Sequence, residues 1–231
     1  MGFLSNIVLS IVDFFYGVTK NYGVSIILLT LTVRFALLPL NIKSMKFTHI
    51  SKVLNPKMQE IQKKYKNDKE KLNQATLELW QKYKVNPAAG CLPLFIQFPI
   101  LIAVITALRS PDFFKVAQPM FLGINLKLPD TGYAWAFGIK YLILPILSVV
   151  TTYLQTKVTS AGNPQANMKS MTIMMTIMMG WITISYPSGI ALYWVTGNIF
   201  AIVQYMVFNR IMDGKDLLPE EGVKDSEKKR N

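Results

Sequence analysis

The sequence predicts an all-α, polytopic membrane protein with five transmembrane helices. Of its 231 residues, 51% are hydrophobic, and the mean hydropathy is positive. Five apolar runs have about the length that a helix needs to cross a bilayer. Lys and Arg gather in alternate connections between these runs, so membrane topology explains the net charge of +12 better than nucleic-acid binding does. The length suits one membrane domain of several helices.

Residues 1–20 form an amphipathic pattern. Apolar side chains recur at helical spacing, at Phe3, Leu4, Ile7, Val8, Ile11, Val12 and Phe15. The opposite face carries polar residues, which predicts a helix lying in the plane of the external membrane interface. No Lys or Arg precedes Lys20, so the segment lacks the positive start of a signal peptide. A poor additional transmembrane helix is the alternative.

The first predicted span, Tyr22–Leu40, contains one charge, Arg34. A charge inside a transmembrane segment costs a few kcal/mol or more and normally faces a bundle interior or a wet cavity. The alternative is that Arg34 extends to the interface. Six residues still separate it from the first polar position, Asn41, which favours a hydrated cavity that Thr30 and Thr32 help to line.

Residues 41–87 predict a two-helix hairpin that projects from the membrane. The segment holds eleven lysines against four acidic residues. It contains two helical stripes of apolar residues, separated near Asn67 and Asp68, where Asn67 and Glu70 resemble an N-cap pair. Pro56 either bends the first helix or marks its start. The lysines fix topology as a solvated face, and they are also compatible with docking of a partner.

Four further spans are predicted at 90–108, 136–156, 170–186 and 190–208, with a disordered tail at 211–231. The second span is interrupted by Pro93 and Pro99, which membrane bundles tolerate. The fourth is rich in methionine, a flexible side chain that suits either varied apolar guests or the lipid-facing surface. The aromatic residues of the 109–135 connection suggest an interfacial belt.

Charge counting sets the orientation. The hairpin, the 157–169 connection and the tail carry 19 Lys and Arg, whereas the segments on the other side carry 5. The positive-inside rule therefore places the N-terminus outside and the C-terminus in the cytoplasm. The predicted location is a bacterial plasma membrane, crossed several times.

Enzyme chemistry is not expected. The chain has no phosphate-binding loop of the Walker type, a single histidine (His49) and a single cysteine (Cys91). We therefore expect no catalytic residues, no metal and no cofactor. The remaining candidates for a polar cavity are Arg34, Gln97, Gln155 and Trp194, although each glutamine is equally suited to hydrogen bonding between helices. Asn198 fits that second role better.

Three segments together resemble the YidC family of membrane protein insertases, which is related to the Oxa and Albino proteins. They are TLTVRFALLPL around Arg34, NPAAGCLPLFIQFPI at 86–100, and PSGIALYWVTGN at 187–198. The lysine-rich hairpin also lies where the family has one. The resemblance covers roughly residues 20–210, and the ordered set of segments is specific although each segment alone is modest.

The resemblance implies a five-helix core, residues 21–210, around a hydrophilic groove that is open to the cytoplasm and to lipid. It implies groove and client-binding roles for Arg34, Gln97, Gln155, Trp194, Thr30 and Tyr193. It also implies a hydrophobic slide on spans two and four, formed by Leu94, Ile96, Leu101, Met171, Met174, Met175 and Met178. A short bacterial form is expected, because the large external domain and lipobox cysteine of other members are missing.

The implied function is insertion of the hydrophobic segments of client proteins into the bilayer without nucleotide hydrolysis. Expected partners are nascent membrane proteins and lipid, and no DNA. Whether the ribosome and the Sec translocon are partners is left open. The tail is not net basic, which does not favour docking of the ribosome through the tail. A small-anion transporter or channel with an arginine site is the competing hypothesis, although no internal repeat supports it. A passive membrane scaffold is the third.

Overall fold

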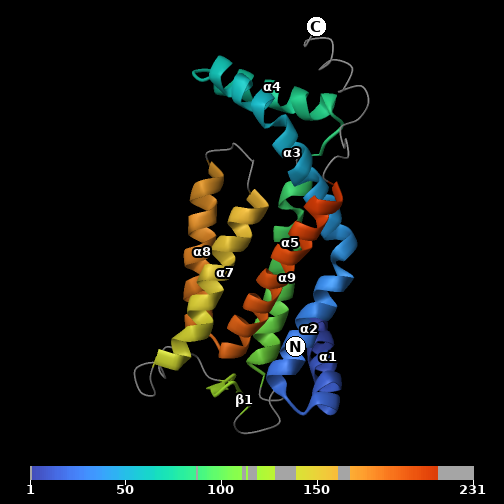
Figure 1. Ribbon diagram of the computed structural model, residues 1–231, viewed down its shortest axis with the longest axis vertical. Coiled ribbons are helices and arrows are strands. Elements are labelled where there is room, and N and C mark those ends of the chain that lie inside the picture. Colours follow the sequence, from blue (N-terminus) through green and yellow to red (C-terminus); the bar gives the residue numbers. More distant parts are fainter. Residues whose placement is uncertain are drawn as a thin grey trace.

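The computed structural model describes residues 2–86, 88–110, 113, 119–127, 139–160 and 167–212, without the side chains at 88–94, 139–140, 160 and 167–171. This part is almost entirely helical (Figure 1). Its α-helices are α1 (Phe3–Thr19), α2 (Tyr22–Ala36), α3 (Leu38–Lys64), α4 (Lys69–Lys82), α5 (Ala88–Leu108), α7 (Ile143–Ser160), α8 (Asn167–Ser185) and α9 (Ser188–Met212). A 3₁₀ helix, η1 (Ile139–Leu142), leads into α7.

The first predicted span is divided by a bend. Helix α2 ends at Ala36, and after Leu37 the chain turns by 64° into α3. Pro39 lies in the first turn of α3, where its missing N–H costs no hydrogen bond. Pro56 lies inside α3 and does not start a new helix. The span and the first arm of the hairpin therefore form one bent pair of helices.

Helices α3 and α4 have their own small apolar cluster. Leu54 and Met58 of α3 are buried against Trp80 of α4 and Tyr83 just after it. The N-cap of α4 is Asp68, whose carboxylate accepts a hydrogen bond from the Lys71 backbone N–H at 3.0 Å. The expectation that Asn67 caps this helix is wrong by one residue. Asp68 has the extended backbone that an N-cap needs.

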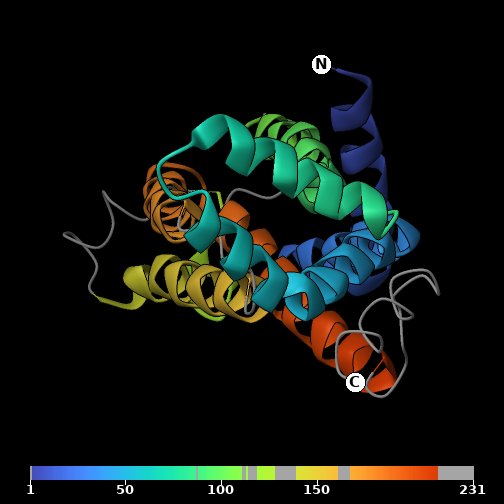
Figure 2. The same cartoon turned by 90° about the horizontal axis from the view of Figure 1, so that it is seen from above.

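Helix α9 is central to the bundle, packing against α2 on one side and α7 on the other (Figure 2). Helix α8 packs on α7, and α5 packs on α1 and α3. The largest cluster of buried apolar residues joins α1, α2, α5 and α9 at the end far from α4. Helix α1 joins it through Val8 and Val12. Its orientation relative to a membrane stays a prediction.

A short β-hairpin lies at that far end. Strands β1 (Met120–Phe121) and β2 (Ile124–Asn125) pair antiparallel. Leu122 and Gly123 both have positive φ, 51° and 78°, as a two-residue turn of the mirror-image type requires. The ring of Phe121 covers Gly23 of α2 so closely that a Cβ there would lie 2.1 Å from it. We call the two ends of the molecule the β-hairpin end and the α4 end.

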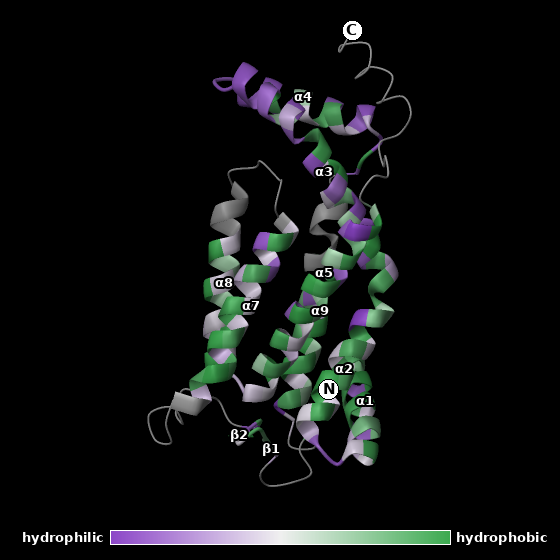
Figure 3. Cartoon of the chain, in the orientation of Figure 1, coloured by the Kyte–Doolittle hydropathy of each residue, from purple (hydrophilic) through white to green (hydrophobic). Residues whose placement is uncertain are grey.

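Hydrophobic residues cover the bundle, whereas hydrophilic residues predominate around α4 (Figure 3). By length and composition, α9 is the one described helix that could cross a bilayer alone, and the bent pair α2–α3 is a second candidate. The other apolar helical stretches found in the described residues are shorter, at Phe3–Thr19, Phe95–Leu108 and Thr172–Ser185. The five-span arrangement therefore remains a prediction.

The helix limits differ from the predicted spans by a few residues at most ends. Helix α7 begins at Ile143, seven residues after the predicted start of the third span, because η1 occupies 139–142. Helix α9 continues to Met212, beyond the predicted end at 208. The segment 136–138, the 161–166 connection and the tail from 213 lie outside the described residues.

Candidate functional site

Arg34 lies in the last turn of α2, just before the bend at Leu37. Its guanidinium packs against the backbone of Gly197 in α9. A Cβ at that glycine would lie 2.6 Å from Nη2 of Arg34 and 3.3 Å from its Cζ. Only a residue without a side chain leaves room for this contact. The charge of α2 is thereby held against the middle of α9.

Arg34 has no acidic partner among the residues that the structure describes. The one described salt bridge joins Lys71 to Asp68 in the helical hairpin. The described acidic residues lie in α1 and in the α3–α4 region, at Asp13, Glu60, Asp68, Glu70 and Glu78. A charge inside an apolar bundle is normally paired or hydrated. Within the described part of the chain, no acid therefore neutralises the positive charge of Arg34.

Two predicted groove residues come together with Arg34. Tyr193 of α9 is only 3% exposed and interacts electrostatically with Arg34. Gln97 of α5 interacts with Tyr193. Yet the Nε2 atom of Gln97 is buried without a hydrogen-bond partner in the described part of the chain. Three helices thus supply a cation, a phenol and an amide with unused hydrogen-bonding capacity.

Trp194 faces α7 and takes part in a network of hydrogen bonds. Its indole N–H donates to the Thr152 hydroxyl at 2.8 Å. The side-chain amide of Asn198 bonds to the hydroxyls of Thr151 and Thr152 at 3.1 and 3.0 Å, in either orientation of the amide. Asn198 therefore links helices, the role that the sequence favoured. Trp194 is 8% exposed and also belongs to the main apolar cluster.

The other two predicted groove residues are Thr30, one helical turn before Arg34 in α2, and Gln155 of α7. Thr30 is 1% exposed, and its hydroxyl donates to the Ile26 carbonyl at 2.7 Å within α2. Gln155 is partly buried, one turn beyond the Thr151–Thr152 pair in α7. Among the described residues, no hydrogen bond connects its side chain with Arg34. The sequence patterns did not distinguish Thr30 and Gln155 from the group formed by Arg34, Gln97 and Tyr193.

The predicted slide residues differ widely in exposure. On α8, Met174 is 64% exposed, and Met175 and Met178 are partly buried. On α5, Ile96 is partly buried and Leu101 is only 4% exposed, in the main apolar cluster. The side chains of Leu94 and Met171 lie outside the described set. The exposed apolar face of α5 consists of residues that the sequence did not single out, Phe95, Phe98 and Ile102.

Comparison with known proteins identifies the family of this chain. Residues 14–215 match the family model described as 60Kd inner membrane protein. A membrane protein insertase YidC from Caldanaerobacter subterraneus subsp. tengcongensis is 38% identical over 200 residues, which span 87% of this chain and 91% of the relative. The chain belongs to the YidC family. The resemblance seen in the three sequence segments is therefore confirmed.

Further matches to YidC proteins support the same family assignment. The membrane protein insertase YidC of Oceanobacillus iheyensis is 40% identical over 209 residues, 85% of this chain and 77% of the relative. A crystal structure titled as an active YidC insertase with the first transmembrane domain resolved matches with a TM-score of 0.66 and 29% identity. That match covers 90% of this chain but 46% of the solved chain.

The site contains features that the sequence analysis did not find. Gly197 was inside a segment quoted for the YidC resemblance, but its contact with Arg34 depends on how α2 crosses α9. Three further polar residues near the C-terminal end of α9 also have buried atoms without a partner among the described residues: Gln204, Tyr205 and Asn209. A signal for them existed, since three polar residues interrupt an apolar helix within six positions. Without the neighbouring helices, that signal does not distinguish a site from a lipid-facing edge.

Proposed function

We propose that this protein is a membrane protein insertase that moves hydrophobic segments of client proteins from the cytoplasm into the bilayer. One observation carries the proposal. In a chain of the YidC family, Arg34 is held between α2 and α9 with no described acid to neutralise it. A partly buried positive charge of this kind suits a transient guest that brings negative or polar groups.

The mechanism follows from the cost of polar groups in hydrocarbon. A client hairpin carries a polar or acidic segment that cannot cross the apolar core unaided. A groove lined by Arg34, Gln97 and Tyr193 would hydrate this segment part of the way and offer a counter-charge. Gln155, Trp194 and Thr30 are proposed as further groove positions. We assign them to the walls of the groove and Arg34 to its charged centre.

The apolar part of the client leaves sideways into lipid. We assign this exit to spans two and four, α5 and α8, including Leu94, Ile96, Leu101, Met171, Met174, Met175 and Met178. The exposed face Phe95–Phe98–Ile102 of α5 extends the same surface. Burying about 20 apolar residues drives the step, with a contribution from the membrane potential and without nucleotide hydrolysis.

The proposed topology has five spans, with the N-terminus outside, α1 as an external interfacial helix, and the α3–α4 hairpin and the C-terminus in the cytoplasm. Cysteine labelling tests it in a Cys91→Ala background. Lys20→Cys and Leu122→Cys are exposed at the β-hairpin end and should react with an impermeant thiol reagent from outside. Asn73→Cys, exposed on α4, should not. Labelling of Asn73→Cys in intact cells would show that the orientation is the opposite of the proposed one.

Reconstitution tests the function itself. Purified protein in liposomes should insert a single-span client, and a matched client pair should differ only in having acidic or neutral residues in the external segment. Arg34→Ala should slow the acidic client by roughly tenfold, equivalent to about 1.4 kcal/mol, and slow the neutral client less. Arg34→Lys should keep much of the activity, whereas Arg34→Glu should be worse than Ala for the acidic client by like-charge repulsion.

The control is Arg210→Ala, which removes an exposed charge near the end of α9 and should leave both clients unaffected. Anion flux through the same liposomes distinguishes the transporter hypothesis. Flux without client insertion would overturn the proposal. Equal insertion of the acidic client by wild type, Arg34→Ala and Arg34→Glu would show that Arg34 does not act through its charge.

A further inference from the structure

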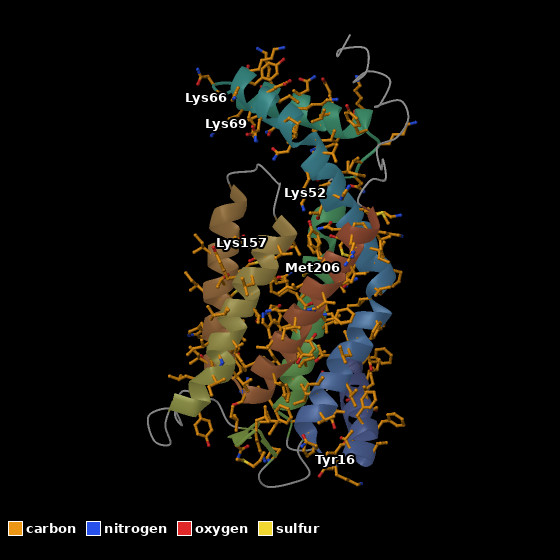
Figure 4. All side chains as sticks on the ribbon, viewed as in Figure 1. Tyr16, Lys52, Lys66, Lys69, Lys157 and Met206 are labelled. Carbon is orange, nitrogen blue, oxygen red and sulfur yellow. The ribbon has the colours of Figure 1, made fainter. Side chains whose placement is uncertain are left out.

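A second positively charged position lies at the α4 end of the bundle, where α3 passes over α9. The Nζ atom of Lys52 lies 5.0 Å from the ring centroid of Tyr205. Figure 4 shows Lys52 near the level at which α3 leaves the bundle, far from Tyr16 at the opposite end. A cation over an aromatic face is attracted to it. The contact with the Tyr205 ring holds the Lys52 ammonium group beside α9.

Tyr205 itself is 2% exposed, and its hydroxyl has no hydrogen-bond partner among the described residues. Asn209 follows four positions later on the same face of α9, and its Oδ1 atom is also buried without a partner. The Nε2 atom of neighbouring Gln204 is in the same condition. Each buried group of this kind costs about 1–3 kcal/mol if it stays unpaired. Three of them in six residues call for a polar ligand or water.

The chemistry of these groups fits a carboxylate. Lys52 supplies three N–H donors and a positive charge, and Tyr205 supplies an O–H donor. Rotation of the Asn209 amide by half a turn brings its N–H donors to the position where Oδ1 has no partner. In the described part of the chain Lys52 has no ion pair, and Glu60, the acid of α3, is exposed two turns away. The positive charge is therefore available to a guest.

The position of Lys52, Tyr205 and Asn209 relative to Arg34 indicates a role for this cluster. Gly197, which holds Arg34, and Tyr205 are eight residues apart in α9, or about 12 Å along the helix axis. Tyr205 lies on the side nearer α4. A segment that enters from the α4 end would therefore meet Lys52 before it meets Arg34.

We propose that Lys52, Tyr205 and Asn209 form a capture site for an acidic side chain of the client, which is then passed to Arg34. This inference rests on the proposed insertase function and adds a specificity-determining stage to it. Lys52 attracts the carboxylate, and the hydroxyl of Tyr205 and the amide of Asn209 donate hydrogen bonds to it. A neutral client bypasses the stage.

The experiment measures initial insertion rates of the acidic and neutral clients in liposomes that contain full-length protein. The variants are Lys52→Gln, Lys52→Arg and Tyr205→Phe, with Lys63→Gln, an exposed lysine of α3, as the matched control. A photo-crosslinker next to the acidic residue of the client reports its contact with α9. We expect Lys52→Gln to slow the acidic client severalfold, leave the neutral client unchanged and weaken the crosslink near Tyr205. Lys52→Arg should restore the rate.

Tyr205→Phe separates the hydroxyl from the ring. It keeps the cation–ring contact and should still slow the acidic client, by less than Lys52→Gln does. Equal slowing of both clients by Lys52→Gln would make the contact a structural clamp between α3 and α9 and overturn the capture site. So would wild-type rates in Lys52→Gln. If wild-type protein inserts neither client, the proposed function fails instead, and the two failures are thereby distinct.

Discussion

The two halves of the bundle on either side of Arg34 differ in how completely their buried polar groups are satisfied. Toward the β-hairpin end, buried hydroxyls have partners: Ser25 donates to the Asn21 carbonyl at 2.8 Å and Thr30 to the Ile26 carbonyl. Between α7 and α8, the Ser148 hydroxyl donates to that of Thr183 at 3.2 Å. The space between the helices is filled by the main apolar cluster. Level with Arg34 and toward the α4 end, the described part of the chain has buried side-chain atoms without partners at Gln97, Gln204, Tyr205 and Asn209.

This difference indicates how one bundle can be closed on one side and receptive on the other. Apolar packing at the β-hairpin end excludes water and ions, because an unpaired polar group there would cost its full desolvation energy. Unpaired donors and acceptors toward α4 are costly when dry and harmless when hydrated or bound to a client. Arg34 lies at the boundary, which supports the proposal that a guest reaches its charge from the α4 side.

The largest effect is expected from breaking the closed half. Gly23→Leu introduces a Cβ that would lie 2.1 Å from the Phe121 ring, and should destabilise the protein by about 3 kcal/mol or more through overpacking. Thermal unfolding in detergent measures the loss. Adding Phe121→Ala should recover part of it. Gly17→Leu, with no atom within 4 Å of the new Cβ, is the control; equal stability of Gly23→Leu and wild type would mean that the β-hairpin does not seal α2.

A local effect is expected in the α3–α4 hairpin, whose apolar cluster is separate from the main one. Trp80→Ala removes the largest side chain of that cluster and should cost about 3 kcal/mol of its local stability. Hydrogen exchange should accelerate in α4 and the outer part of α3, and stay unchanged in α2 and α9. Insertion should fall while the bundle stays folded. Faster exchange throughout α9 would show that the two clusters unfold as one unit.

A third variant tests the boundary itself. Gly197→Ala places a Cβ 2.6 Å from Nη2 of Arg34, and the flexible end of the arginine moves away rather than the helices. The acidic client should then slow by roughly tenfold, as in Arg34→Ala, with thermal stability nearly unchanged. The double variant Arg34→Ala/Gly197→Ala should be no slower than either single one. Additive losses would mean that Gly197 acts independently of Arg34.

The sequence predicted the helical class and the family because hydrophobic runs, charge asymmetry and short segments are local properties. It identified Arg34 because a charge in an apolar run is conspicuous wherever its helix packs. It did not distinguish Gln97 and Tyr193, which interact with each other beside Arg34, from Thr30, whose hydroxyl bonds within its own helix, or from Gln155. That distinction depends on helix rotation and crossing, and so does the contact of Lys52 with Tyr205.

The smallest effect concerns the cap of α4, far from both halves of the bundle. The Lys71 backbone N–H, assisted by the Lys71 side chain at 3.0 Å, holds the pKa of Asp68 below its ordinary value. A carboxyl with a lowered pKa in the folded state stabilises α4 above its unfolded pKa of about 3.9 and loses that contribution as the pH falls through the folded value. The Asp68 side chain is 40% exposed, so solvent screening keeps the effect small.

Hydrogen exchange at the Lys71 amide, corrected for its intrinsic pH dependence, measures this contribution. Protection should decline below about pH 4 in wild type. In Asp68→Asn the amide oxygen still caps the helix, so protection should persist without the same decline, whereas Asp68→Ala should lose protection at every pH. Because α4 is separate from the main cluster, exchange in α9 should be the same in all three proteins. A change in α9 would connect the cap to the bundle and contradict the independence that Trp80→Ala tests on a larger scale.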